Sequence, residues 1–132
     1  MKRILAVILT LSLLLGAVSA LSDVDYASDY ETALTLATND LTNVKGLETA
    51  VDILQRLGGY QMARSYSQYF QALMDIMFTE GDLGIARKRI DTCARNAVFV
   101  KNLAERGLPS CEEIGTYIDT RETEAAVEYG NA

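Results

Sequence analysis

The apolar residues of the stretch Tyr60–Phe78 recur at helical spacing, and this stretch restricts the possible folds more than any other. At about 100° per residue, they fall within an arc of roughly 160° on one side of a helix. The opposite side is polar or charged, from Gln61 to Asp75. One neighbouring helix cannot cover so wide an arc. We therefore expect this helix to pack against at least two others, at the centre of a small helical domain.

Four further helices are predicted from the same apolar spacing, over residues 23–41, 44–57, 83–106 and 111–129. Asn43, Asp82 and Ser110 stand where N-caps are expected, and glycines follow the second and fourth helices. Strand patterns are nearly absent. The connections are only two to four residues long, which favours antiparallel neighbours. The predicted fold class is all-α, a small antiparallel array of helical hairpins with about five helices.

The fourth predicted helix, 83–106, supplies the candidate partner-binding residues. We expect one unbroken helix whose small apolar side chains, including Ala97 and Ala104, face inward. The cations of Lys88, Arg95 and Arg106 then share the outer face with the ring of Phe99, and these four residues are our candidate site. An aromatic ring among cations suits a contact with an acidic partner. Alternatively, the acidic helix 111–129 lies alongside, pairs these charges and covers Phe99.

The first twenty residues have the pattern of a secretory signal peptide. Lys2 and Arg3 precede an apolar run over residues 4–15, and small residues around Ala20 provide a cleavage site. Cleavage after Ala20 predicts an exported protein, periplasmic or extracellular, with one all-helical domain over residues 21–132. The alternative is an uncleaved N-terminal anchor, although the run is short for a membrane span of ~20 residues. We predict no other contact with a membrane.

The composition argues against several classes of function. The net charge is −6, and an anionic chain repels nucleic acid and anionic lipid, so we predict neither as a partner. The sequence has no histidine, which removes Ser–His and Cys–His catalysis and histidine-ligated metals. The acidic residues between Asp23 and Glu31 lack the glycine and terminal glutamate of an EF-hand. We therefore predict no metal, no cofactor and no catalytic site.

The two cysteines, Cys93 and Cys111, are predicted to form a disulfide, because exported proteins usually pair their cysteines. Closing this loop would stabilise the fold by roughly 3 kcal/mol. An unbroken helix to Gly107 would place Cys93 about 21 Å from its end. Residues 107–111 span only about 13–14 Å, so the bond requires either that this helix bends or ends early, or that residues 107–111 run straight back beside it. An intermolecular disulfide and free buried thiols are the alternatives.

A faint repeat is also present. A glycine followed by an alanine one turn later recurs near Ala50 and Ala86, 36 residues apart, close to the ~34-residue period of tetratricopeptide repeats. The segment Glu80–Ala86 resembles the turn and second-helix start of such a repeat, which implies a TPR-like stack of helical hairpins. Plain antiparallel helices joined by glycine turns give the same pattern, and that interpretation is the preferred one.

These features favour an exported, non-catalytic helical domain that binds another protein or a second copy of itself. It would act as an adaptor, an inhibitor or a subunit of an envelope assembly. The alternative is a carrier of small apolar ligands or a stress-protective chaperone, with the ligand held against the wide apolar face of 60–78. A histidine-free enzyme that uses arginine to stabilise a small anion is a third hypothesis.

Overall fold

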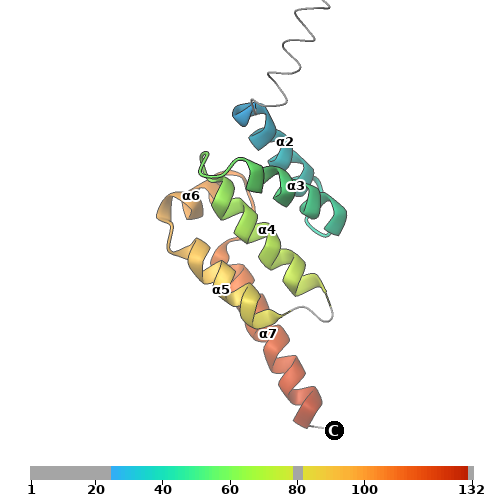
Figure 1. Ribbon diagram of the computed structural model, residues 1–132. Helices are drawn as coiled ribbons and strands as arrows, with labels where there is room; N and C mark the ends of the chain where they lie inside the picture. Colours follow the sequence, from blue (N-terminus) through green and yellow to red (C-terminus); the bar gives the residue numbers. More distant parts are fainter. Residues whose placement is uncertain (1–24, 79–81, 131–132) are drawn as a thin grey trace, which may run out of the picture.

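The computed structural model describes residues 25–78 and 82–130, with side chains up to residue 124, and every regular element within them is an α-helix (Figure 1). This confirms the all-α prediction. The predicted signal peptide 1–20 lies outside the described residues, so export remains a prediction. The helices in chain order are α2 (Tyr26–Asn39), α3 (Val44–Arg56), α4 (Ala63–Met77), α5 (Leu83–Ala94), α6 (Ala97–Glu105) and α7 (Cys111–Gly130).

The helix ends follow the predicted capping residues. Side-chain oxygens of Asn43, Asp82 and Ser110 each accept a hydrogen bond from a backbone N–H of the next turn, at 3.2, 2.8 and 3.0 Å. These bonds satisfy N–H groups that have no partner inside the helix. Gly58 and Gly107 have φ angles of +58° and +70°, the left-handed conformation that ends a helix at low steric cost for glycine.

Helix α4 lies at the centre of the array. It contacts α3 on one side and α5 on the other, while α2 packs on α3 and α7 packs on α5. Figure 1 shows α4 between the α2–α3 pair and the α5–α7 pair. Its side chains Tyr66, Tyr69 and Phe70 are fully buried, and Ile76 nearly so. The expectation that the arc of Tyr60–Phe78 needs more than one neighbour is therefore confirmed.

The prediction of one unbroken helix over 83–106 is wrong. The chain leaves the helix after Ala94, and Asn96 adopts an extended conformation before α6 begins. The Asn96 side chain accepts a hydrogen bond from the N–H of Phe99 at 3.1 Å, and its amide donates to Ser65 on α4 at 3.5 Å. Asparagine competes well with helical backbone bonds in this way, so it starts a new helix here instead of continuing the old one.

The break changes which residues of this segment face the core. Ala97 and Ala104, expected to face inward, are exposed, whereas Phe99 and Leu103 are buried. The ring of Phe99 packs edge-on against Tyr66, with ring centroids 4.8 Å apart. The prediction that Phe99 lies on an outer face is therefore wrong, because it assumed a helical register that the break at Asn96 resets.

Candidate functional site

An open apolar groove lies where the C-terminal half of α4 meets the α2–α3 turn and the start of α7. Its volume is about 310 Å³, at the lower end of the ~300–1,000 Å³ typical of ligand sites. Helix α4 provides one side, the α2–α3 turn a second and α7 with the residues before it a third. The lining residues are Leu41, Thr42, Leu73, Ile76, Met77, Pro109, Glu113, Ile114 and Tyr117.

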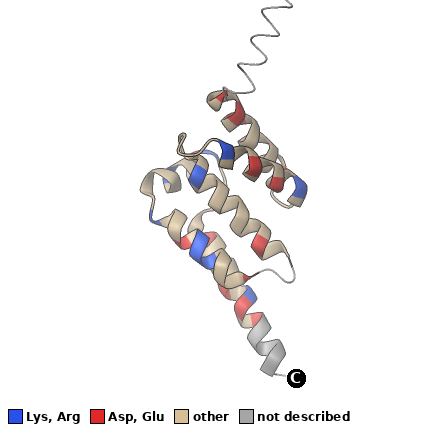
Figure 2. Ribbon diagram, viewed as in Figure 1, with Lys and Arg blue, Asp and Glu red and all other residues tan. Residues whose placement is uncertain are grey.

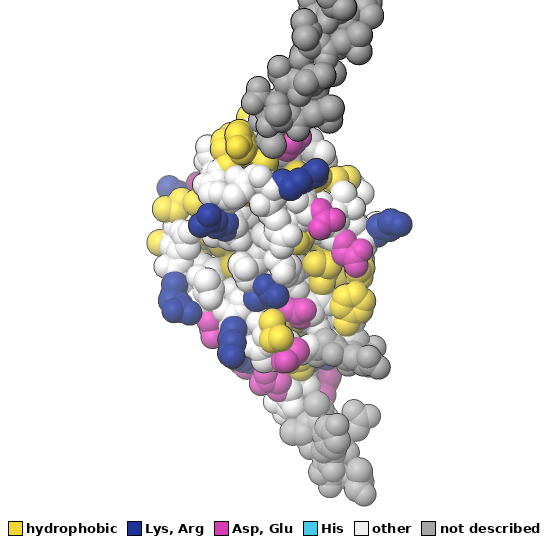
Figure 3. All heavy atoms as spheres, viewed as in Figure 1, with side chains coloured by type: hydrophobic (Ala, Val, Ile, Leu, Met, Phe, Trp, Pro, Cys, Tyr) yellow, Lys and Arg dark blue, Asp and Glu magenta, His cyan; other side chains and the backbone are white. Residues whose placement is uncertain are grey.

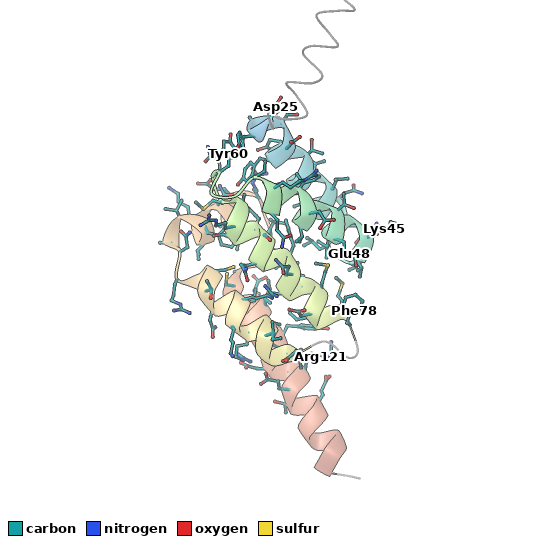
Figure 4. The ribbon with its side chains drawn as sticks, viewed as in Figure 1. Asp25, Lys45, Glu48, Tyr60, Phe78 and Arg121 are labelled. Carbon is teal, nitrogen blue, oxygen red and sulfur yellow. The ribbon has the colours of Figure 1, made fainter. Side chains whose placement is uncertain are left out.

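The apolar surface continues beyond the groove. Tyr117, on its α7 side, is 51% exposed, and Phe78, directly after the lining residue Met77, is 48% exposed. Figure 4 labels Phe78 at the end of α4, on the same side of the molecule as Lys45 and Glu48 at the start of α3. Figure 3 shows hydrophobic side chains gathered at this edge. Exposed aromatic side chains beside an apolar groove are typical of surfaces that contact other molecules.

Two hydrogen bonds hold the walls of the groove in place. The buried hydroxyl of Tyr69 donates to the carbonyl of Pro109 at 2.7 Å. The Arg121 guanidinium of α7 donates to the carbonyl of Ile76, near the end of α4, at 3.0 Å. A cation at a helix C-terminus also interacts favourably with the helix dipole. The groove is therefore preformed, which lowers the entropic cost of binding.

The charge around the groove is negative. Glu113 belongs to its lining, and Asp40 lies in the same turn as the lining residue Thr42. Hydrogen bonds from the Thr42 hydroxyl and backbone N–H lower the pKa of Asp40, which keeps this carboxylate charged. No lysine or arginine lines the groove. Among the described residues, neither carboxylate has a cation within ion-pair distance, so both are available to a cationic ligand.

The predicted partner-binding residues do not form one patch. Lys88 and Arg95 are exposed on and just after α5, as expected, but the break at Asn96 separates them from Arg106. The Arg106 guanidinium instead reaches α2, 3.1 Å from the Glu31 carboxylate, and its central carbon lies 5.9 Å from the centre of the Tyr66 ring. Phe99 belongs to the core. The four residues therefore have three different environments.

The alternative that the acidic helix pairs the charges of Lys88, Arg95 and Arg106 is not what the structure shows, but α7 does pair with another basic residue of α5. Arg87 of α5 forms an ion pair with Asp119 of α7 and lies 3.6 Å from Glu122. Figure 2 shows the basic residues of α5 beside the acidic residues of α7. Arg89 pairs instead with Asp75 of α4, at 3.3 Å. These contacts hold α5 between α4 and α7.

Cys93 and Cys111 are buried free thiols in this structure. Burial, together with the nearby Cys111, raises the pKa of Cys93 to about 12. Cys93 is the penultimate residue of α5 and Cys111 is the first residue of α7, and these helices are in contact. The early end of α5 removes the geometric obstacle that an unbroken helix would impose. The disulfide between them remains a prediction.

Comparison with protein-family models, with curated proteins and with solved structures gives no match for this chain. The described residues contain no cluster of three or more metal-ligating side chains of the His, Cys, Asp or Glu type. Within 25–78 and 82–130, no helix is both long enough and apolar enough to span a membrane.

The groove was anticipated only in part. One hypothesis from the sequence was that a small ligand binds against the wide apolar face of residues 60–78. Leu73, Ile76 and Met77 of that face do line the groove. The contributions of Pro109 and Tyr117 were missed. The feature of the sequence that could have predicted them is the short connection between Gly107 and Cys111. It brings Pro109 back to α4, where the carbonyl of Pro109 accepts a hydrogen bond from Tyr69.

Proposed function

We propose that this protein is an exported interaction domain whose groove binds an apolar, positively charged segment of a protein. The observation that carries this proposal is the groove itself, whose preformed apolar lining includes one carboxylate, Glu113, and no cation. An amphipathic helix with lysine or arginine beside its apolar side chains suits such a surface. Attraction between the opposite charges would raise the association rate and select against acidic partners.

The shape of the surface favours a protein segment over a small ligand. Small ligands are usually enclosed over most of their surface, whereas the rings of Tyr117 and Phe78 remain about half exposed. A row of apolar side chains on a helix would cover the groove and both rings together. The second candidate is a carrier of small apolar ligands, and the volume of about 310 Å³ supports it. A single lining carboxylate supports binding over catalysis.

The direct test is a binding titration of the mature chain, residues 21–132, with a synthetic amphipathic helical peptide that has leucine on one face and lysine on the other. We expect Tyr117→Ala to weaken binding roughly tenfold, because it removes an aromatic contact from the groove. Tyr26→Ala is the matched control, since Tyr26 is 47% exposed but lies on α2, outside the groove. It should leave the affinity unchanged.

A second pair of variants tests the charge. Glu113→Lys should weaken the lysine peptide several-fold, and the loss should shrink at high salt, where surface charges are screened. Glu112→Lys is its control, because Glu112 occupies the same first turn of α7 without lining the groove. Equal affinity for a peptide with glutamate in place of lysine would contradict the proposal. Tight binding of an apolar dye with no binding of either peptide would favour the carrier instead.

A further inference from the structure

A second apolar surface of this molecule also lacks a covering element among the described residues. Four exposed residues of α6 are Ala97, Val98, Lys101 and Ala104, and Val100 and Glu105 are exposed beside them. We call the first four of these residues the α6 face. Val98 is 65% exposed, more than any other large hydrophobic residue of the described chain. A helix of nine residues that buries Phe99 and Leu103 on one side thus leaves a largely apolar stripe on the other.

The net charge around the α6 face is positive, opposite to that of the groove, because Arg95 and Lys101 outnumber the one carboxylate there, Glu105. Lys101 lies one turn after Val98, and Arg95 lies two residues before the first residue of α6. Both are exposed, and no carboxylate among the described residues lies within ion-pair distance of either. An apolar side chain flanked by two cations is the pattern that the proposed function requires of a ligand for the groove.

We propose that a second copy of this chain supplies that ligand, with the α6 face of one molecule seated in the groove of the next. This inference rests on the proposed function of the groove. Val98 would enter the apolar lining, and Lys101 and Arg95 would approach Glu113 and Asp40. The alanines of the face allow α6 to come close to the groove, because they have no long side chain to displace.

The arrangement of the two surfaces makes the contact head-to-tail. Figure 1 places α6 and the α2–α3 turn on opposite sides of α4, so one molecule can use its groove and its α6 face at the same time. Such a contact repeats into an open chain of molecules or closes into a ring. A symmetric pairing of two grooves is disfavoured, since it would bring the Glu113 carboxylates of the two copies together.

The experiment is sedimentation velocity of residues 21–132 over a range of concentrations, in low and high salt, with and without reductant. We expect reversible association that weakens as salt rises. Val98→Glu and Glu113→Lys should each reduce self-association at least tenfold. Leu36→Glu is the control, because Leu36 is 40% exposed on α2 and belongs to neither the groove lining nor the α6 face. Circular dichroism of each variant confirms that the helices are intact.

Mixing the two variants gives the sharpest readout. Val98→Glu retains a working groove, and Glu113→Lys retains a working α6 face, so an equimolar mixture should form a dimer that grows no further. Failure of the mixture to associate, in a chain whose wild type does associate, would overturn a head-to-tail contact. Association that disappears only when reductant is added would also overturn it, in favour of an intermolecular disulfide.

Failure of this inference differs from failure of the proposed function. A wild-type chain that stays monomeric but still binds the lysine peptide in a Glu113-dependent way would overturn the second copy as partner and leave the groove's function intact. A chain that neither associates nor binds the peptide would overturn both.

Discussion

The two halves of α4 have the same kind of apolar face but different surroundings. In the N-terminal half, Tyr66, Tyr69 and Phe70 are fully buried, and Phe99 of α6 packs against the rings of Tyr66 and Tyr69. In the C-terminal half, Leu73 and Met77 are partly exposed and line the groove. The residue types alone do not explain this difference. The break at Asn96 folds α6 back over one half, and no described helix covers the other half in the same way.

Phe99→Ala should have the largest effect, because it removes the side chain through which α6 covers α4. Loss of a fully buried phenylalanine costs about 3–5 kcal/mol. Denaturant unfolding measures this loss. Val98→Ala, one residue away on the exposed side, should change the free energy of unfolding by less than about 0.5 kcal/mol. A loss below about 1 kcal/mol for Phe99→Ala would show that α6 does not seal the N-terminal half.

Oxidation should have the next largest effect. A Cys93–Cys111 disulfide would tie α5 to α7, which forms one wall of the groove, and would raise the free energy of unfolding by roughly 3 kcal/mol. The measurement is denaturant unfolding of the oxidised and reduced chains, with thiols counted by mass spectrometry after alkylation. The double variant with both cysteines changed to alanine should show no redox dependence. A fully oxidised monomer no more stable than the reduced chain would contradict this prediction.

Alkaline pH should destabilise the reduced protein, because Cys93 and Tyr69 are buried in their protonated forms. Burial raises the pKa of Cys93 from 9.0 to about 12, so the folded state holds this proton more tightly than the unfolded state does. Its contribution to stability is complete below about pH 9 and is lost as the pH rises toward 12. Burial raises the pKa of Tyr69 as well, which adds to the loss.

Unfolding midpoints at about pH 8 and about pH 11 measure this effect. Cys93→Ala should show a smaller decrease between the two pH values, and disulfide formation should have the same consequence. A midpoint that stays constant up to about pH 11 in the reduced wild type would contradict the burial of this thiol.

Of these changes, Tyr69→Phe should have the smallest effect on stability. It should also weaken peptide binding in the groove. It removes the hydrogen bond to the Pro109 carbonyl, a loss of about 1 kcal/mol. Because Pro109 lines the groove, affinity for the lysine peptide should also fall. Tyr60→Phe is the control, since Tyr60 packs against Tyr26 and Tyr30 away from the groove. Equal peptide affinities for the two variants would show that Tyr69 does not position the groove wall.

Local rules were sufficient to predict most of the helices. Apolar spacing located the segments, and short-range capping by Asn43, Asp82 and Ser110 set three of their starts. The break at Asn96 was missed because the apolar repeat continues through it without a glycine or proline. Its causes are tertiary. Asn96 gains a contact with Ser65, and Phe99 gains a place among the rings of α4.

The groove was harder to predict than the helices for a related reason. Leu41 and Leu73 are partly buried against the core, and Ile114 is buried. Which inward-facing residues stay uncovered depends on where the α2–α3 turn, the end of α4 and the start of α7 converge. No local pattern contains that information. The same limit applies to the candidate basic patch, whose members were separated by a single misplaced helix boundary.

The rings around Tyr66 also give the protein an internal optical probe. The sequence has no tryptophan, so near-ultraviolet circular dichroism arises mainly from tyrosine. Tyr66 contacts Tyr30, Phe70 and Phe99 in fixed orientations. Detachment of α6 from α4 would therefore reduce the near-ultraviolet signal while the far-ultraviolet helix signal remained almost constant. Partial opening of this molecule can be followed without attaching any label.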